Sequence, residues 1–235
     1  MNTIVDFFLE PYLQVAGINI FLEFIAAVLG ITSVFYAKKE NILVYPTGII
    51  STGLYVYLLS QWALYGDLII NIYYTLMSLY GWYMWTRISN KTHEPLKITR
   101  ANYLDNIKAF AIFVFTAIFV IIAYRHYNVI PDLNFMDSIH YAFQKISAGS
   151  LIEFRKATPY LDTFTTAAAF VAMWLMANKK IENWIFWIIT NIVSIPLYFV
   201  KGYGFTGIQY TIFFVLAFLG FKEWKKNLNK QNQTV

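Results

Sequence analysis

The sequence predicts an all-α integral membrane protein in which seven transmembrane helices form two parallel three-helix repeats joined by a linker helix, a 3+1+3 layout. Three observations support this fold class. Apolar residues make up 58% of the 235 residues and charged residues only 13%, whereas about a quarter of a soluble domain is charged. The apolar residues gather in runs of about 18 to 20, the length that crosses a bilayer as a helix. Residues in the two ends of the chain also match each other in order.

Charged and turn-forming residues set the limits of each predicted element. In order, the seven predicted spans cover about 19–37, 42–60, 67–86, 107–124, 160–178, 183–200 and 204–221. Residues 1–18 are too short and too acidic to span, because Asp6 and Glu10 interrupt the apolar residues, so we expect an interfacial segment. The segment from Leu133 to Arg155 mixes apolar and charged residues and predicts a helix lying on the membrane surface.

These elements divide the chain into five parts. The predicted parts are an interfacial segment (1–18), a first repeat (19–86), a linker with the fourth span (87–159), a second repeat (160–224) and a cytoplasmic tail (225–235). Pro95 breaks any helix early in the linker, and Pro159 ends the longest connection. Pro46 and Pro196 lie within predicted spans, where they act as hinges or as ordinary kinks that neighbouring helices accommodate.

The internal repeat rests on matches at a nearly constant spacing. The matched pairs are Glu23 with Asp162, Ile42 with Trp184, Tyr45 with Trp187, Asn71 with Gln209, Gly81 with Gly220 and Trp85 with Trp224, at spacings between 138 and 142. Three spans reverse the direction of the chain and one linking span restores it, so the repeats are parallel around an axis along the membrane normal. Such duplications place a substrate pathway between the halves; the alternative is a bundle duplicated for stability alone.

The distribution of basic residues predicts the orientation in the membrane. One face of the predicted bundle carries five Lys and Arg residues and the other carries thirteen. Because basic residues stay cytoplasmic, we expect the N-terminus outside and the C-terminus in the cytoplasm. The net charge of +5 therefore bears on topology and on contact with the lipid bilayer, and nucleic acid is not an expected partner.

The sixth predicted span holds the strongest candidate for a binding site. Trp184, Trp187, Asn191 and Ser194 follow one another at i, i+3, i+7 and i+10, so they share one helical face. Two indole rings on one face can sandwich a flat heteroaromatic ligand or a cation. A buried amide in a membrane span needs a partner, which can be a ligand, water or another helix. The alternative interpretation is an interfacial tryptophan belt with an interhelical amide bond.

Two further spans carry polar stripes. The residues that share a face are Asp67, Asn71, Tyr74 and Ser78 in the third span and Thr206, Gln209, Tyr210 and Phe213 in the seventh. We expect the amides of Asn71 and Gln209 to face each other across the axis between the repeats. Glu23 and Asp162 lie near the predicted outer ends, where they attract a cationic substrate or, for Asp162, cap a helix.

Composition argues against several other kinds of site. The chain has no cysteine, which excludes disulfides and thiolate metal sites. Its histidines, His93, His126 and His140, fall in predicted connections without metal-ligand spacing, so we expect neither a metal nor another cofactor. No catalytic constellation or phosphate-binding loop is found, which argues against an enzyme. No basic residue precedes Lys38, so we expect no cleavable signal peptide of the usual form.

The run WIFWIITN, from Trp184 to Asn191, resembles the WxxWxxxN motif of the Pnu vitamin transporters. The flanking segments that agree with this family are YGDLIINIYYTLMSLYGWYMW, PYLDTFTTA, LMANKKIENW and PLYFVKGYGFTGIQY. The family shares its 3+1+3 layout with the SWEET sugar transporters. The resemblance implies facilitated diffusion of a vitamin-like heteroaromatic compound across the inner membrane, followed by trapping through a separate cytoplasmic kinase.

The resemblance also implies a ligand and a set of binding residues. The residues implied by the motif are Trp184, Trp187 and Asn191, as the lining of a ring-binding pocket. Candidates for contacts with ligand hydroxyls, chosen by helical face and by the repeat, are Gln209, Tyr210, Asn71 and Tyr74. The PnuC branch carries nicotinamide riboside and the PnuT branch carries thiamine, and both ligands are cationic heteroaromatic compounds that suit an aromatic pocket. We expect nicotinamide riboside, with thiamine as the alternative.

Other functions are less favoured than transport of these two ligands. A sugar is the third substrate class, by analogy with the SWEET transporters. A ligand-sensing receptor without transport would usually carry a fused signalling domain, for which the tail after Trp224 is too short. Assembly into a homo-oligomer is left open.

Overall fold

The computed structural model describes residues 8, 12–13, 15–62, 65–88 and 95–233. Within these ranges the regular secondary structure is helical apart from two isolated bridges, Ile88 with Pro95 and Thr99 with Lys180. The helices are α2 (Gly17–Lys38), α3 (Val44–Gln61), α4 (Tyr65–Thr86), α5 (Tyr103–His126), α6 (Phe135–Ser147), α7 (Leu151–Ala177), α8 (Asn183–Lys201) and α9 (Gly204–Gln233). The predicted interfacial segment 1–18 falls largely outside the described residues. The all-α class is confirmed for the part of the chain that is described.

Five of these helices are long and apolar enough to cross a membrane, namely α2, α5, α7, α8 and α9. Helices α3 and α4 have 18 and 22 residues and are therefore of similar length, but tyrosine, glycine and hydroxyl residues make them less apolar. The chain is thus built as a multi-pass membrane protein. Crossing of the membrane by α3 and α4, and with it the number seven, stays a prediction.

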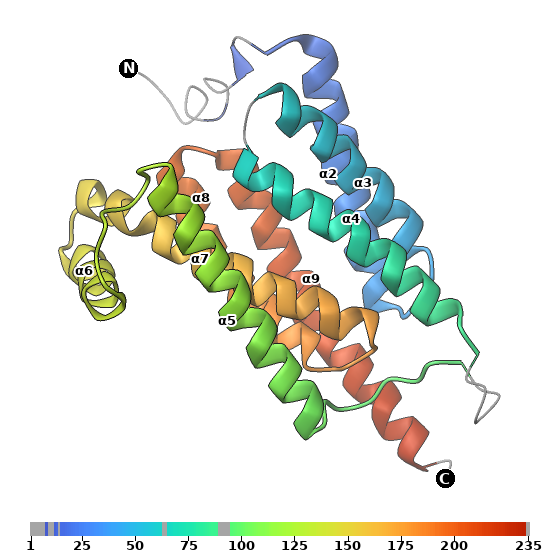
Figure 1. The fold of residues 1–235 in the computed structure, drawn as a ribbon. Coiled ribbons are helices and arrows are strands. Elements are labelled where there is room, and N and C mark those ends of the chain that lie inside the picture. The colour runs from blue at the N-terminus through green and yellow to red at the C-terminus, as the bar shows by residue number, and fades with distance from the viewer. Residues whose placement is uncertain (1–7, 9–11, 14, 63–64, 89–94, 234–235) are drawn as a thin grey trace.

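The helices form two groups that face each other (Figure 1). Helix α3 packs between α2 and α4, and α8 packs between α7 and α9. The groups meet where α2 contacts α9 and where α4 contacts α7. Helix α5 lies along α7, and the short α6 packs against α7 at one end of the molecule. Helix α2 begins at the end of the molecule opposite to the end at which α9 stops (Figure 1).

The linker before α5 is fastened to the second group. The amide of Thr99 donates to the Lys179 carbonyl at 3.0 Å, and the amide of Ala101 donates to the Glu182 carboxylate at 2.8 Å. Lys180 pairs with Asp105 in the first turn of α5 at 2.9 Å. These contacts place α5 with α7 and α8 rather than midway between the groups.

The chain around α6 and α7 differs from the sequence prediction. A surface helix was expected over 133–155, and α6 occupies only Phe135–Ser147, starting at the cap formed by Asn134. Helix α7 then begins at Leu151 and runs through Pro159, where the longest connection was expected to end and the fifth span to begin. A helical proline leaves the carbonyl four residues earlier without its N–H donor. Here that carbonyl belongs to Arg155, and it accepts the Thr158 hydroxyl at 2.8 Å, so the helix continues.

Two other expectations are corrected. Pro46 was expected to kink a span, but it lies in the first turn of α3, where the missing N–H has no intrahelical partner to lose. Residues 225–235 were expected to form a separate tail, but α9 extends to Gln233. The reason is burial, because Trp224 is 0% and Leu228 8% exposed in the core of the bundle.

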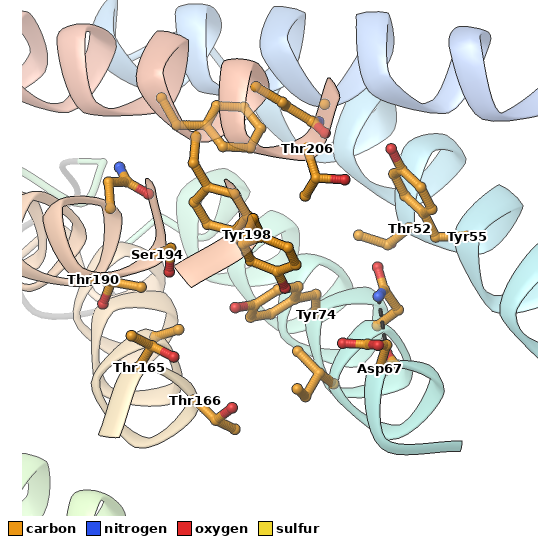
Figure 2. A pocket seen from close by; sticks show the side chains of 18 of the residues that line it. Thr52, Tyr55, Asp67, Tyr74, Thr165, Thr166, Thr190, Ser194, Tyr198 and Thr206 are labelled. Atoms are coloured by element: carbon orange, nitrogen blue, oxygen red, sulfur yellow. Dashed lines mark hydrogen bonds between the residues drawn. The ribbon is translucent and has the colours of Figure 1, made fainter. Parts of the chain in front are cut away.

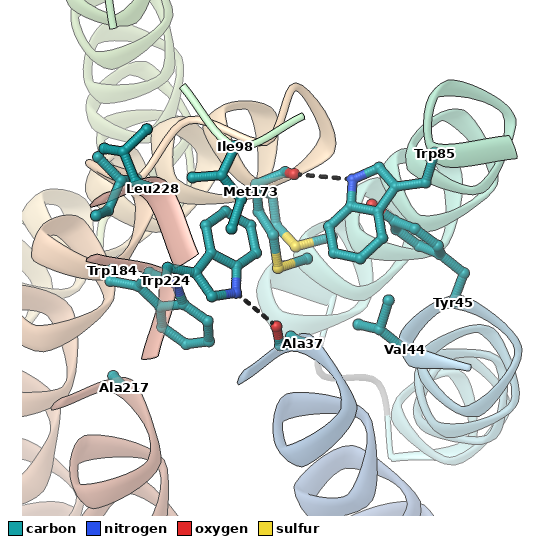
Figure 3. Close-up of a cluster of buried hydrophobic side chains, with 12 residues drawn as sticks. Ala37, Val44, Tyr45, Trp85, Ile98, Met173, Trp184, Ala217, Trp224 and Leu228 are labelled. Atoms are coloured by element: carbon teal, nitrogen blue, oxygen red, sulfur yellow. Dashed lines mark hydrogen bonds between the residues drawn. The ribbon is translucent and has the colours of Figure 1, made fainter. Parts of the chain in front are cut away.

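Four large aromatic side chains, Tyr45, Trp85, Trp184 and Trp224, close one end of the bundle, and we call them the aromatic closure (Figure 3). Two reciprocal hydrogen bonds tie the groups together there. Trp85 on α4 donates its indole N–H to the Met176 carbonyl on α7 at 3.2 Å. Trp224 on α9 donates to the Ala37 carbonyl on α2 at 2.9 Å. The two donor residues are 139 positions apart, and so are the two acceptor residues, so each group donates to the other in the same way.

The closure also corrects the register of the repeat. The sequence alignment paired Trp184 with Ile42, but the structure gives Trp184 the role of Tyr45, again 139 positions away. Tyr45 lies edge-on to Trp85 at 5.1 Å and Trp184 lies edge-on to Trp224 at 5.6 Å. Each ring covers a glycine of its own group. A Cβ atom at Gly81 would come within 2.4 Å of Tyr45, and one at Gly220 within 2.6 Å of Trp184.

An ion pair between equivalent positions of the two groups lies beside the aromatic closure. The Lys179 ammonium lies 2.8 Å from the Glu40 carboxylate and 4.5 Å from the centre of the Trp85 ring. Glu40 and Lys179 are also 139 positions apart, and both have positive φ angles, of 57° and 49°. The same left-handed turn therefore follows α2 and α7, and the two turns are joined through their side chains.

Candidate functional site

A cavity of about 770 Å³ lies between the two groups of helices, with lining residues from every described helix except α6. It reaches the aromatic closure at Trp184 and extends to Asp67, Asp162 and Lys201 near the opposite helix ends. Figure 2 shows its polar side chains, among them Tyr74 of α4 and Tyr198 of α8. A volume of this size is within the range of small-molecule sites, about 300 to 1,000 Å³.

All seven sequence-predicted site residues line this cavity, and they divide between its end and its middle. Trp184 lies at the closed end, where it is 1% exposed and packed against Trp224. Trp187 is one turn further along α8, and its ring lies 6.3 Å from that of Tyr74 at an angle of 62°. The two indoles therefore have different neighbours and do not form a sandwich in this structure. Trp187 instead pairs with Tyr74, and both rings line the cavity.

Asn191 presents an amide with no hydrogen-bond partner among the described residues, although the residue is only 2% exposed. Its counterpart in the first group, 139 positions earlier, is Thr52. The Thr52 hydroxyl lies 2.7 Å from that of Thr75 and also bonds the Gly48 carbonyl at 2.9 Å. The first group thus satisfies its polar residue internally, whereas the second leaves one donor–acceptor group turned to the cavity.

The expected pairing of Asn71 with Gln209 is replaced by separate contacts. The Asn71 amide donates to the carbonyl of Asp67 on its own helix at 2.9 Å. The Gln209 amide lies against α2, 3.7 Å from where a Cβ atom of Gly30 would stand. The constant spacing of 139 explains the difference, because it makes Tyr210 rather than Gln209 the counterpart of Asn71.

Tyr198 is the main lining residue that the sequence analysis missed. Its ring stacks on that of Tyr210 at 4.9 Å with an angle of 15° between planes. The signal was present, because Tyr198 follows Ser194 by four residues and Lys201 follows three residues later, which continues the stripe of Asn191. Thr190 also lines the cavity and has a buried hydroxyl without a partner among the described residues.

The charged side chains of the lining gather at the end opposite the closure. Lys201 is paired with Asp162, and Glu23 accepts a hydrogen bond from the Tyr12 hydroxyl at 3.1 Å. Asp67 lies in the first turn of α4. Among the described residues no group of three His, Asp or Glu side chains could hold a metal ion. The cavity therefore offers aromatic faces, an amide and hydroxyls, which suits reversible binding of a heteroaromatic compound.

Residues 20–226 match the family model described as nicotinamide mononucleotide transporter. The chain belongs to this nicotinamide mononucleotide transporter family. The resemblance to the Pnu transporters is thereby confirmed, since members of that group are among its relatives.

Within the family, the chain is 26% identical over 207 residues to the nicotinamide riboside transporter PnuC of Escherichia coli, covering 86% of this chain and 84% of that protein. It is 24% identical over 149 residues to the riboflavin/roseoflavin transporter RibM of Streptomyces davaonensis, covering 63% and 58%. The fold matches the crystal structure of the vitamin B3 transporter PnuC with a TM-score of 0.62 and 24% identity, over 89% of this chain and 83% of that one. These relatives are named as transporters, which agrees with a membrane transporter rather than an enzyme.

Proposed function

We propose that this protein takes up nicotinamide riboside, bound in the cavity between its two helix groups. The observation that supports this most is the unpartnered amide of Asn191, one turn from Trp187 on α8. A nicotinamide ring placed against Trp187 and Tyr74 would bring its carboxamide within reach of that amide, because one helical turn advances about 5.4 Å. The Asn191 side chain offers one donor group and one acceptor, which complements a carboxamide.

The remaining predicted site residues would bind the sugar. Asn71, Gln209 and Tyr210 line the part of the cavity between the Trp187 ring and the charged end. In our proposal their amides and hydroxyl contact the ribose. Trp184 forms the closed end of the pocket as part of the aromatic closure. Thiamine is the alternative ligand from the sequence, and riboflavin is a second one because a relative is named as a riboflavin transporter.

We further propose the arrangement in the membrane. Seven spans, α2 to α5 and α7 to α9, would cross it in a 3+1+3 layout, with α6 on the outer surface. The first repeat would cover about 19–86, after the segment 1–18 and before the linker 87–159; α7 would start within that linker, and α9 would carry the second repeat (160–224) on into 225–235. The aromatic closure, beside Lys179, then faces the cytoplasm of the inner membrane, and Asp67 and Lys201 lie at the outer mouth.

Transport in this proposal is facilitated diffusion. The lining carboxylates lie at one end of the cavity, whereas a proton-coupled carrier would more naturally place one at its middle. Net uptake then requires consumption of the substrate inside, for which a separate cytoplasmic kinase is suited. In proteoliposomes, uptake should stop at equal concentrations and should not respond to an imposed proton gradient; accumulation driven by the gradient would contradict this mode.

The first test is calorimetric binding on the detergent-purified full chain with nicotinamide riboside, thiamine and riboflavin in turn. We expect binding of nicotinamide riboside, weakened at least tenfold in Trp187→Ala because the ring contact is removed. Trp82→Ala is the matched control, since Trp82 is 40% exposed and does not line the cavity. Binding of thiamine or riboflavin alone would transfer the substrate assignment, and normal binding by Trp187→Ala would reject the ring contact.

A further inference from the structure

The charged residues that line the cavity are Glu23, Asp67, Asp162 and Lys201. Acidic groups outnumber basic ones among them. The imbalance is concentrated near the end opposite the aromatic closure, where a ligand would enter from outside in the proposed orientation. A charge in such a cleft acts strongly on ligands, because its field is focused by low-dielectric walls.

Two of the three carboxylates already have partners. Asp162 pairs with Lys201, and Glu23 accepts the Tyr12 hydroxyl at 3.1 Å. The Asp67 carboxylate has neither an ion pair nor a hydrogen bond among the described residues, since Asn71 bonds its backbone carbonyl instead. Asp67 is therefore the cavity acid without a direct partner in the described part of the chain: the Lys201 ammonium and the Asp162 carboxylate act on it electrostatically with opposite signs, and its carboxylate is left to interact with a ligand.

A structural role in starting α4 is the competing explanation, because acids in a first helical turn interact favourably with the helix dipole. The repeat provides a comparison. The counterpart of Asp67 in α9, 139 positions later, is Thr206, and α9 begins without any acid in its first turn. Both residues line the cavity, as Figure 2 shows. Helix formation at this place in the fold does not require a carboxylate.

We propose that Asp67 is a specificity-determining residue that favours ligands with a positively charged ring. This rests on the proposed function and extends it, because it assigns the choice between cationic and uncharged ligands to one side chain. Asp67 precedes Tyr74 by seven residues, about 10 Å along the helix at 1.5 Å per residue. A ring held at Tyr74 and Trp187 would thus feel the Asp67 charge without touching it, and an entering cation would pass beside it.

The test compares ligands of one shape and different charge. Nicotinamide riboside carries a pyridinium cation, its reduced dihydropyridine form is uncharged at the ring, and nicotinamide mononucleotide adds an anionic phosphate. In the full-length wild-type protein we expect the cation to bind more tightly than the reduced form. Asp67→Asn, which preserves shape, should lower the affinity for the cation three- to tenfold, leave the reduced form within twofold, and improve binding of the mononucleotide relative to the cation.

Two further variants keep the result interpretable. Glu223→Gln removes an exposed carboxylate from α9 on the closure side and should change none of the three affinities. Thr206→Asp adds a carboxylate at the counterpart position and should strengthen the preference for the cation, which tests the idea even if Asp67→Asn does not fold. An unchanged cation-to-reduced ratio in Asp67→Asn, or an equal loss of both ligands, would overturn the role of Asp67 alone. Wild-type protein that binds none of the ligands would overturn the proposed function.

Discussion

Individual side chains decide which half of the molecule is equipped for a ligand. Thr52 and Asn191 occupy equivalent places, but only the Thr52 side chain is bonded within its own group. Gly48 and Trp187 are likewise equivalent, and only the second half carries a ring there. The repeat thus keeps a shared frame while one half gains the groups that can hold a heteroaromatic compound.

Removal of the Asn191 amide should reduce affinity without loss of the fold. In Asn191→Leu a bound carboxamide would lose its partner, and an unsatisfied polar group costs about 1 to 3 kcal/mol, or roughly 5- to 150-fold in affinity. Calorimetric titration with nicotinamide riboside measures the loss, and the thermal midpoint reports folding. Thr52→Val is the matched control at the equivalent position and should bind within a few-fold of wild type. A collapse of the thermal midpoint in Asn191→Leu would instead indicate a purely structural amide.

Much of the site could be predicted at this scale, because helical periodicity places Trp187, Asn191 and Ser194 on one face whatever the neighbouring helices do. What could not be predicted was which side chains of the neighbouring helices each polar helical face would contact. The Asn71 and Gln209 pairing was wrong because the spacing between repeats was misjudged by one residue, and one residue turns a helical side chain by about 100°.

Whole helices were predicted closely, because apolar runs and flanking lysines mark their limits in the sequence. The errors lie where tertiary contacts override local signals. Helix α9 continues beyond its predicted end because Trp224 and Leu228 are buried, and α7 continues through Pro159 because Thr158 satisfies the free carbonyl. Neither compensation is visible in a residue-by-residue propensity.

The compensation in α7 can be measured by a double-mutant cycle. Thr158→Val removes the hydroxyl that bonds the Arg155 carbonyl and should destabilise the protein by about 1 kcal/mol. In a Pro159→Ala background the restored N–H can bond the same carbonyl, so the same substitution should cost clearly less. Thermal or denaturant unfolding of the four proteins gives the coupling. Equal costs in both backgrounds would show that the hydroxyl does not replace the missing bond.

The molecule as a whole is closed at one end by contacts that its two groups make reciprocally. The Tyr45 hydroxyl and the Trp184 indole N–H are buried there without a partner among the described residues. Unsatisfied groups make a closed state less favourable. A closure of this kind, stabilised by Trp85, Trp224 and the Glu40–Lys179 pair, is suited to open and close as the substrate passes.

In the proposed orientation, weakening the closure should expose the cavity from the cytoplasmic side. The chain has no cysteine, so Ser194→Cys introduces a single reporter in the cavity. In inside-out vesicles, a membrane-impermeant maleimide should label this reporter several-fold faster when Trp224→Phe removes the bond to the Ala37 carbonyl. Trp82→Phe, on the exposed face of α4, should leave the rate unchanged. Equal rates in all variants would show that the closure does not control access.

The two reciprocal bonds of the closure end on backbone carbonyls, at Ala37 and Met176. A carbonyl is present whatever side chain its residue carries, so mutation of either acceptor residue leaves the bond available. After a gene duplication, selection for these bonds would therefore preserve the donor tryptophans but would leave the side chains of the acceptor residues free to change. The two halves can lose most of their sequence identity in this way while still packing against each other through the same hydrogen bonds.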